Sequence, residues 1–347
     1  MIYSVIMDGQ SIFAYSSDLL LVSPSLTIEL NAAGSFSFKM PREHTYYDLP
    51  KLMTSDVEVY EQGDLIWYGR VSEIDDTDMN KDKSIYCEGP LAYFNDTVQR
   101  PYPAQETTNH DFFRLIVQRH NEYVPLNRQF TIGDITVIEQ TITAELDYCT
   151  SKDAINQCIS NYGGYLIFRK ENDVNYVDWI YNLEAIGPQP IQYALNLVSL
   201  SKFMEGSGIY TSIIPLGKEV DGAKLTIADV NEGLDYLDSD LIDTYGRITK
   251  IVEWSQIGEA EELLQYAEQW LTSQQFNNIR IECDAAELYY LDNSYAPFRV
   301  GQLVHVISDP HAVDIYLPIT EITINLDSPV KTISIGSEDE TEFTGMV

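Results

Sequence analysis

The feature that most constrains the fold is a repeated run of short alternating strands around tight turns near the start of the chain. In "SLTIEL" and "SFSFKM", apolar and polar residues alternate on either side of the turn "NAAG". "DVEVYEQGDLIWYGRVSEID" repeats this arrangement, with Gly63 and Asp64 at the turn. Alternation of period two is typical of strands with one buried face, and turn residues between two such runs predict a hairpin. Residues 1–95 therefore predict a compact all-β domain.

Helical spacing begins after the prolines of "RPYPAQETTNHDFF". Phe112 and Ile116 recur at the interval of a helix and predict a first helix. Its candidate N-caps are Thr107, Thr108 and Asn109. A second helix is predicted from Ser151 to Tyr162, because the pair of glycines that follows permits the left-handed backbone that ends many helices. A hairpin with its tip at residues 171–173 comes next, so residues 96–185 predict a small α+β domain.

Strands resume after residue 185 and are interrupted by an acidic segment that contains one helix. This helix is predicted over about residues 255–275, with Ser255 as its candidate cap. Its apolar stripe is Ala260, Leu263, Leu264, Ala267, Trp270 and Leu271. The stretch "YTSIIPLGKE", Tyr210–Glu219, reads as a short strand that stops at Pro215 and Gly217, and it suits either a ligand-binding loop or a structural joint.

The charge balance excludes one large class of partner. The chain has 54 acidic and 21 basic residues, for a formal net charge of -33. A protein that grips nucleic acid needs clustered Lys and Arg to displace counterions from phosphates, so nucleic-acid binding is not expected. No apolar run approaches the roughly 20 residues that span a bilayer, and the start "MIYSVIMDGQ" has no signal-peptide pattern, so we expect no membrane insertion and folding in a cytoplasm.

The cysteines indicate core positions and no disulfide frame or zinc site. Cys87, Cys149, Cys158 and Cys283 show no CxxC pairing and sit in apolar or mixed segments. We therefore expect reduced thiols.

Motifs that carry enzyme chemistry are absent from the sequence. There is no GxSxG, HExxH, GxxxxGK[ST] or GxGxxG motif, and the Gly-Ser-Gly of "MEGSGIY" reads as a loop. Asp76, Asp78 and Asn80 fall at positions one, three and five of a calcium loop. Lys81 stands where that loop needs glycine, and Cys87 stands where it needs glutamate, which favours a solvated hairpin tip.

One further group of metal-capable side chains is His305 and His311 with Asp309 and Asp314. Their spacing matches no recurrent zinc site, and structural roles are expected, with His305 in the strand "LVHVIS" and His311 in a turn. Among 54 carboxylates, the pair that a glycosidase would need cannot be identified. We therefore assign no catalytic, cofactor-binding or metal residue and expect no cofactor. The 24 tyrosines suit subunit interfaces or sugar-stacking sites, and ordinary sheet faces equally.

The order of several segments resembles the phage tail hub family, also called prophage tail endopeptidase or tail-associated lysin. The segments are "YGRVSEIDD", "SIYCEGPLAYFND", "SKDAINQCISNYGGYLIFRKENDVNYVDWI", "ALNLVSLSKF", "YTSIIPLGKE", "YLDSDLIDTYGRITKIVEW" and "VGQLVHV". The resemblance covers nearly the whole chain, and its structural module is similar to the central hub of contractile-phage baseplates.

The resemblance implies an α+β, mainly β fold with two β-barrel-like tube domains. We place the first at 1–95 and the second at 186–220 and 280–347, with the α+β domain at 96–185 and an acidic helix-containing insertion at 221–279. On this basis Tyr210–Glu219 is a structural joint at which the chain leaves the barrel.

The resemblance also implies a function and partners. A homotrimeric ring would continue the tail tube and dock on a distal tail protein hexamer. It would also contact a tape-measure protein and a tip or receptor-binding protein. DNA would pass through the ring without specific binding. The location would be the virion tail tip, after synthesis in the bacterial cytoplasm. The family's wall-degrading activity is not carried over, because no nucleophile or metal motif is present. The alternatives are a carbohydrate-binding module and a cell-wall hydrolase of the tail tip.

Overall fold

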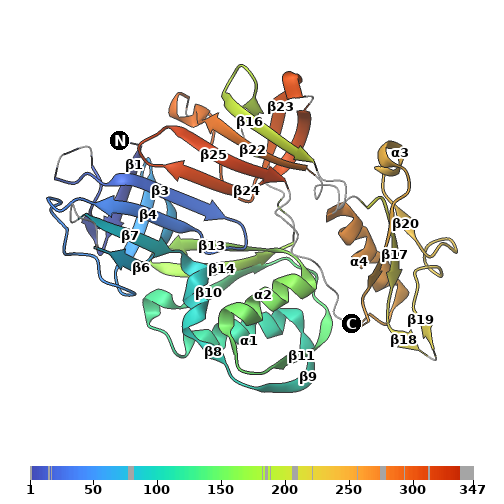
Figure 1. Ribbon diagram of the computed structural model, residues 1–347. Coiled ribbons are helices and arrows are strands. Elements are labelled where there is room, and N and C mark those ends of the chain that lie inside the picture. The colour runs from blue at the N-terminus through green and yellow to red at the C-terminus, as the bar shows by residue number, and fades with distance from the viewer. Residues whose placement is uncertain are drawn as a thin grey trace. The chain divides into compact units, whose positions relative to one another are not determined.

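A computed structural model describes residues 2–14, 16, 18–76, 82–181, 183, 187, 189–204, 210–220, 222–255, 257–273, 279–292, 294–311 and 313–336. The chain divides into two compact units (Figure 1). Unit 1 comprises Met1–Leu200 and Cys283–Ser334, and unit 2 comprises Ser201–Glu282 and Ile335–Val347. Strands dominate and four α-helices accompany them in the described residues, so the predicted α+β, mainly β class is confirmed.

A 13-stranded sheet forms the centre of the fold. In spatial order its main path is β16 (Leu197–Met204), β22 (Ile279–Ala286), β25 (Val330–Gly336), β24 (Val313–Asn325), β3 (Val22–Glu29), β4 (Ser35–Met40), β7 (Lys83–Glu88), β6 (Asp64–Asp75), β5 (Asp56–Glu61), β1 (Tyr3–Met7) and β2 (Gln10–Ser11). β23 (Leu303–Ser308) pairs with β24 and with β15 (Ile191–Gln192).

The antiparallel pair β24 and β3 joins the two ends of the sequence. Ile324 lies opposite Leu26, and Ile322 lies opposite Ile28. The two predicted tube domains are therefore continuous with each other in one open sheet. No closed barrel forms among the described residues, and the assignment of two barrel-like tube domains stays a prediction.

The α+β part of unit 1 lies between these two groups of strands in sequence. Its elements are η1 (Pro90–Asp96), β8 (Val98–Gln99), β9 (Tyr102–Thr108), α1 (Asn109–Asn121), η2 (Leu126–Arg128), β10 (Phe130–Ile135), β11 (Thr141–Leu146), β12 (Cys149–Thr150), α2 (Ser151–Tyr162), β13 (Tyr165–Glu171) and β14 (Val174–Ile180). The predicted bounds of α2 are confirmed. Of the candidate N-caps, Thr108 caps α1 by accepting a hydrogen bond from the backbone N–H of Asp111.

The core of this part forms where α1 and α2 contact the sheet β10-β14-β13. Phe113 and Ile155 are fully buried with Trp179 from β14. Two ion pairs, Arg128 with Asp56 at 2.5 Å and Lys170 with Glu58 at 2.5 Å, hold the α+β part against β5.

Unit 2 contains a small sheet of its own in the order β20-β17-β21. Its elements are β17 (Ser212–Leu216), β18 (Glu219–Val220), β19 (Ala223–Lys224), β20 (Leu237–Asp238), α3 (Ile242–Tyr245), β21 (Thr249–Glu253) and α4 (Ala260–Ser273). Ile213 of β17 is buried with Ala267 and Trp270 of α4. Tyr210–Glu219, the stretch at which the chain was expected to leave a barrel, thus contains the central strand of the small sheet, β17. The four-part division of the chain remains a prediction.

Two local expectations differ from the structure for physical reasons. The strand predicted in Tyr210–Glu219 ends at Leu216, directly before Gly217, but Pro215 lies within it, opposite Val252 of β21. In the described part of the chain β20 pairs with Ser212 and Ile213, so Pro215, which has no N–H to donate, lies beyond the β20 ladder. α4 begins at Ala260 and not near Ser255, because Ile257 is buried and accepts a backbone hydrogen bond from Lys218. Ser255 is therefore not a cap of the helix.

Candidate functional site

One face of the large sheet is polar across five adjacent strands. We define the polar face as Ser25, Thr27, Glu29, Ser35, Ser37, Lys39, Glu73, Asp75, Ser84, Tyr86, Glu88, Glu321, Thr323 and Asn325, on β3, β4, β6, β7 and β24. Cross-strand partners share a face, and the register places Thr27 opposite both Thr323 and Ser35. The intervening residues point the other way, and Leu26 and Phe36 among them are fully buried. The sheet is therefore amphipathic, with a half-exposed polar side.

Short hydroxyl side chains predominate at the centre of the polar face. The hydroxyls of Thr27 and Thr323 lie 3.2 Å apart. Ser25 lies opposite Ser37 on one side and Asn325 on the other. Short hydroxyl side chains leave few protruding groups at the centre of the polar face.

The polar face is also acidic. Its carboxylates are Glu29, Glu73, Asp75, Glu88 and Glu321. Arg70 neutralises Glu88 at 2.8 Å, and Lys39 supplies one further positive charge. Glu29 lies opposite Glu321. Burial, together with the neighbouring carboxylate of Glu321, raises the pKa of Glu29 above its ordinary value. An uncompensated pair of this kind gives the face a negative potential.

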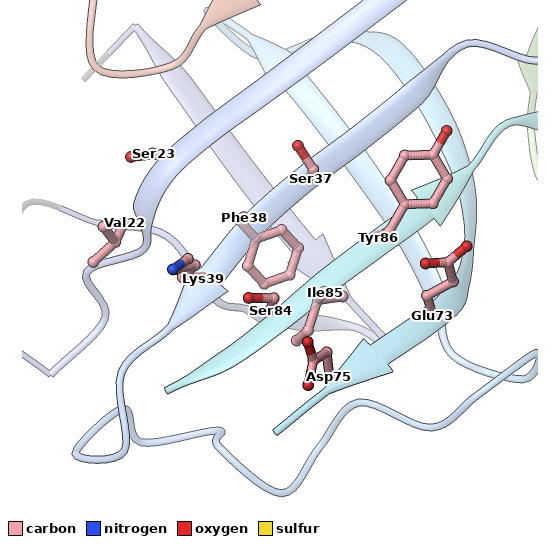
Figure 2. A pocket seen from close by; sticks show the side chains of 10 residues that line it. All are labelled: Val22, Ser23, Ser37, Phe38, Lys39, Glu73, Asp75, Ser84, Ile85 and Tyr86. Carbon is pink, nitrogen blue, oxygen red and sulfur yellow. The ribbon is translucent and has the colours of Figure 1, made fainter. Parts of the chain in front are cut away.

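An open groove of ≈ 390 Å³ lies at one end of the polar face (Figure 2). It is lined by Val22, Ser23, Ser37, Phe38, Lys39, Glu73, Asp75, Ser84, Ile85 and Tyr86. Tyr86 is 41% exposed and stands next to Ser37 and Glu73 in register. The groove belongs to the polar sheet surface and contains no histidine or cysteine in its lining.

A buried ionic cluster lies elsewhere in unit 1. We define the ionic cluster as Glu61, Glu287, Arg299 and Lys331, with Tyr3, Gln189 and Tyr290 around them. The Lys331 Nζ is 2.8 Å from Glu61 Oε1 and 2.7 Å from Glu287 Oε1, and all three side chains are fully buried. Arg299 reaches the other carboxylate oxygen of Glu61 at 2.7 Å.

Hydrogen bonds complete the ionic cluster. Glu287 accepts from the side chain of Gln189 at 2.6 Å and from the backbone N–H of Phe298 at 3.0 Å. Tyr290 donates to Glu61, and its hydroxyl lies 2.6 Å from that of Tyr3. The cluster joins β5 to β25 and to the segment 287–299, so it fixes strands from both ends of the sequence.

The charges in the ionic cluster balance one another. Burial alone would raise the pKa of Glu61, but the ammonium of Lys331 and the guanidinium of Arg299 outweigh it, and the pKa of Glu61 lies below its ordinary value. Burial and the Glu61 carboxylate raise the pKa of Tyr290 and of Tyr3. The tyrosines therefore remain protonated donors beside an ionised carboxylate.

Sequence reasoning missed the ionic cluster although a signal for it exists. In β5, Glu61 follows Val57 and Val59 on the buried side of the strand. In β25, Lys331 precedes Ile333 and Ile335 in the same way. A charged residue in phase with buried apolar residues indicates a buried partner of opposite charge.

The structure separates the histidines that were considered as metal ligands. His305 Nε2 lies 2.7 Å from Asp314 and the ring stacks on Tyr316, whereas His311 Nδ1 lies 2.7 Å from the hydroxyl of Ser308. No group of three or more metal-capable side chains occurs within the described residues. His305 lies in β23 as expected, and His311 ends the short helix η5 (Asp309–His311).

The remaining candidate residues have the following positions. No disulfide joins the four cysteines; Cys87, Cys158 and Cys283 are buried and Cys149 is half-buried. The calcium-like positions Asp78 and Asn80 and the Gly-Ser-Gly segment lie outside the described residues. Within the part of the chain that the structure describes, no helix is long and apolar enough to cross a membrane.

Comparisons with known proteins identify the fold. Residues 186–341 match the family described as prophage endopeptidase tail. Prophage tail protein gp18 of Listeria monocytogenes EGD-e is 14% identical with a TM-score of 0.66, and the similarity covers 98% of this chain and 96% of that chain. The 43 kDa tail protein of prophage MuSo2 from Shewanella oneidensis is 11% identical with a TM-score of 0.65, covering 96% and 97% of the two chains. No curated protein matches the sequence.

The same fold extends to a secretion system. The E. coli c3393 protein, a component of the type VI secretion system described as similar to T4 tail proteins gp27 and gp5, is 8% identical with a TM-score of 0.54. The similarity covers 96% of this chain and 77% of that chain. At these identities the comparison establishes a shared fold, and the resemblance to phage tail proteins is confirmed at that level.

Proposed function

We propose that this chain, whose residues 186–341 belong to the prophage endopeptidase tail family and which has the fold of prophage tail proteins over nearly its whole length, is a structural tail hub. In this proposal three copies form a ring that continues the tail tube and docks on a distal tail protein hexamer. A closed ring of identical subunits needs two different contact surfaces on each subunit. DNA passes through the centre during ejection.

The polar face supports this proposal most strongly, as the wall of the channel. Its hydroxyls hold water, and its carboxylates repel phosphates, so a passing duplex meets no site that retains it. The apolar side of the same strands is already buried by the protein's own core, as Leu26 and Phe36 illustrate. The sheet can therefore present the polar face to a water-filled channel without exposing apolar area.

The proposed hub role also implies where the protein is made, where it resides and which proteins it contacts. A hub of this kind is made in the bacterial cytoplasm and resides at the tail tip, in contact with the tape-measure protein and a tip or receptor-binding protein. We assign it no hydrolytic activity, because the sequence carries no hydrolase motif and the proteins of the same fold are tail proteins. Release of fragments from purified peptidoglycan would contradict this assignment, and binding on a glycan array would favour the carbohydrate-binding alternative.

Light scattering across a concentration series tests the ring. The expected mass is three times 39.5 kDa. A monomer at all concentrations, also in the presence of the cognate distal tail protein, would contradict the proposal.

Thiol accessibility tests the placement of the polar face. In the trimer, Ser37→Cys should react with a small maleimide and be protected from a bulky polymer-linked maleimide. Glu122→Cys, at the exposed C-cap of α1, is the matched control and should react with both. Equal reaction of both cysteines with the bulky reagent would place the polar face outside the channel.

A further inference from the structure

An exposed patch of tyrosine and arginine side chains occupies the end of the α+β part where β8 meets β12. We define the Arg100 patch as Val98, Arg100, Tyr102, Arg119, Tyr123 and Tyr148. Gln99 pairs with Cys149, which places Arg100 across from Tyr148 at the end of this ribbon. Arg119 donates from its guanidinium to the backbone carbonyl of Arg100 at 3.1 Å. The patch is therefore one continuous surface.

The arginines of the patch contact rings instead of carboxylates. The guanidinium of Arg100 lies 5.9 Å from the centre of the Tyr123 ring, and that of Arg119 lies 5.4 Å from the centre of Tyr102. Neither guanidinium has an ion-pair partner among the described residues. Arg114, on the same helix as Arg119, is paired with Asp111 at 3.0 Å. These two guanidinium groups therefore keep hydrogen-bond donors for a carboxylate that another molecule supplies.

The aromatic and aliphatic side chains of the patch face solvent. Tyr148 is 70% exposed, Tyr123 is 63% exposed and Val98 is 54% exposed. Tyr148 also has a φ of 43°, in the left-handed region that aromatic residues rarely adopt. An exposed ring held in an unfavourable backbone conformation gains nothing from burial within the subunit, and such local strain is concentrated at functional sites.

We propose that the Arg100 patch docks an acidic segment of another protein. Tyrosine and arginine are enriched at the energetic centres of protein interfaces, where rings supply buried area. Guanidinium groups bind carboxylates through paired hydrogen bonds, and their low hydration suits a contact that excludes water. A nucleic acid fits less well, because a duplex backbone needs a row of cations, whereas the patch has two arginines beside exposed rings and Val98 that suit apolar side chains. The occupant is therefore a peptide segment that carries carboxylates beside apolar side chains.

Fluorescence anisotropy with labelled probes tests the docking site on the full chain. The probes are a short peptide of alternating Glu and Leu, its Lys-for-Glu counterpart, a neutral Ser-for-Glu counterpart and a short DNA duplex. The acidic peptide should bind, and Arg100→Ala should weaken its affinity about tenfold, as expected for a residue at the centre of an interface. Arg114→Ala is the matched control, because that exposed arginine already has a carboxylate partner, and it should leave the affinity unchanged.

A second variant separates docking from folding. Asparagine tolerates the left-handed conformation of residue 148 better than tyrosine does. Tyr148→Asn should therefore leave the unfolding midpoint unchanged or raise it, while it lowers the affinity for the acidic peptide. Equal affinity for the acidic and neutral peptides, or an unchanged affinity in Arg100→Ala, would overturn the proposal. Preferential binding of the DNA duplex would also overturn the proposal and identify the Arg100 patch as a phosphate-binding site.

Discussion

The Lys331 Nζ lies 2.8 Å from Glu61 Oε1, and both side chains are fully buried although 270 positions separate them in the sequence. The same ammonium lies 2.7 Å from Glu287. A buried cation between two buried carboxylates stabilises its surroundings only while all partners are present, because each uncompensated charge retains its full desolvation penalty.

Replacement of Lys331 by methionine should therefore strongly destabilise unit 1. The substitution leaves two carboxylates for the single guanidinium of Arg299, and removal of one member of a buried ion pair typically costs about 3–5 kcal/mol. Urea unfolding measures the change. Arg114→Met is the control: Arg114 and Asp111 are both exposed and lie 3.0 Å apart, and such a surface pair contributes only about 0–1 kcal/mol. Equal losses in the two variants would show that the ionic cluster contributes no more than a surface pair.

Acid should destabilise the protein through Glu61. Its pKa in the folded chain lies below the ordinary value of 4.5, so its contribution to stability is complete above that value and is lost as the pH falls through the folded pKa. The free energy of unfolding should therefore decline below about pH 4.5. Glu61→Gln should lower stability at neutral pH and give a shallower decline in acid, as followed by circular dichroism. A parallel decline in the variant and the wild type would assign the acid sensitivity to other carboxylates.

Positive charge on the polar face should create DNA binding that the natural chain lacks. A variant with lysine at Ser25, Thr27 and Ser37 places three ammonium groups on adjacent strands. An electrophoretic mobility shift assay at low salt should detect a complex with duplex DNA. This complex should dissociate as the salt concentration rises, since counterion release drives the binding. The control carries lysine at three exposed, uncharged positions of the α+β part, Gln105, Gln118 and Gln157, so both variants gain three positive charges. DNA binding by the natural chain would contradict the channel-wall role.

Two adjacent glycines at the end of α2 should respond differently to alanine. Gly163 and Gly164 have φ values of 70° and 89°, so both substitutions introduce backbone strain. At Gly163 an added Cβ meets nothing within 4 Å, and the loss should be about 1 kcal/mol. At Gly164 it would lie 2.6 Å from Val137 and 2.8 Å from the carbonyl of Ile180, so the loss should be clearly larger. Thermal unfolding of the two variants makes the comparison, and equal midpoints would show that the hairpin shifts to accommodate the new methyl group.

Local patterns in the sequence predicted the local structure well. The helix Ser151–Tyr162 was predictable because apolar spacing and the following glycines act within one short stretch. The alternating hairpins of the first region were predictable for the same reason. The start of α4 was not predictable, because the burial of Ile257 and its hydrogen bond from Lys218 depend on a segment that lies much earlier in the sequence.

The long-range structure was predictable only through the resemblance of the sequence to the phage tail hub family. Nothing local in β3 indicates that its partner is β24, and period-two alternation alone does not distinguish an open sheet from a closed barrel. The polar face follows from that pairing, since Thr27 and Thr323 become neighbours only in the folded sheet. The Arg100 patch likewise depends on the pairing of β8 with β12. Its arginines and tyrosines are scattered over about fifty positions and carry no local motif.

The pairing of β24 with β3 has a consequence for biosynthesis. While a ribosome makes the chain, β3 emerges roughly three hundred residues before its partner, and its outer edge has no strand to bond. Contacts between such distant segments form slowly, because the entropy of closing the intervening loop must be overcome first. The nascent amino-terminal strands therefore expose a bare hydrogen-bonding edge for most of translation. This interval is the period in which chaperones or neighbouring copies can bind that edge, and it ends only when the last strands leave the ribosome.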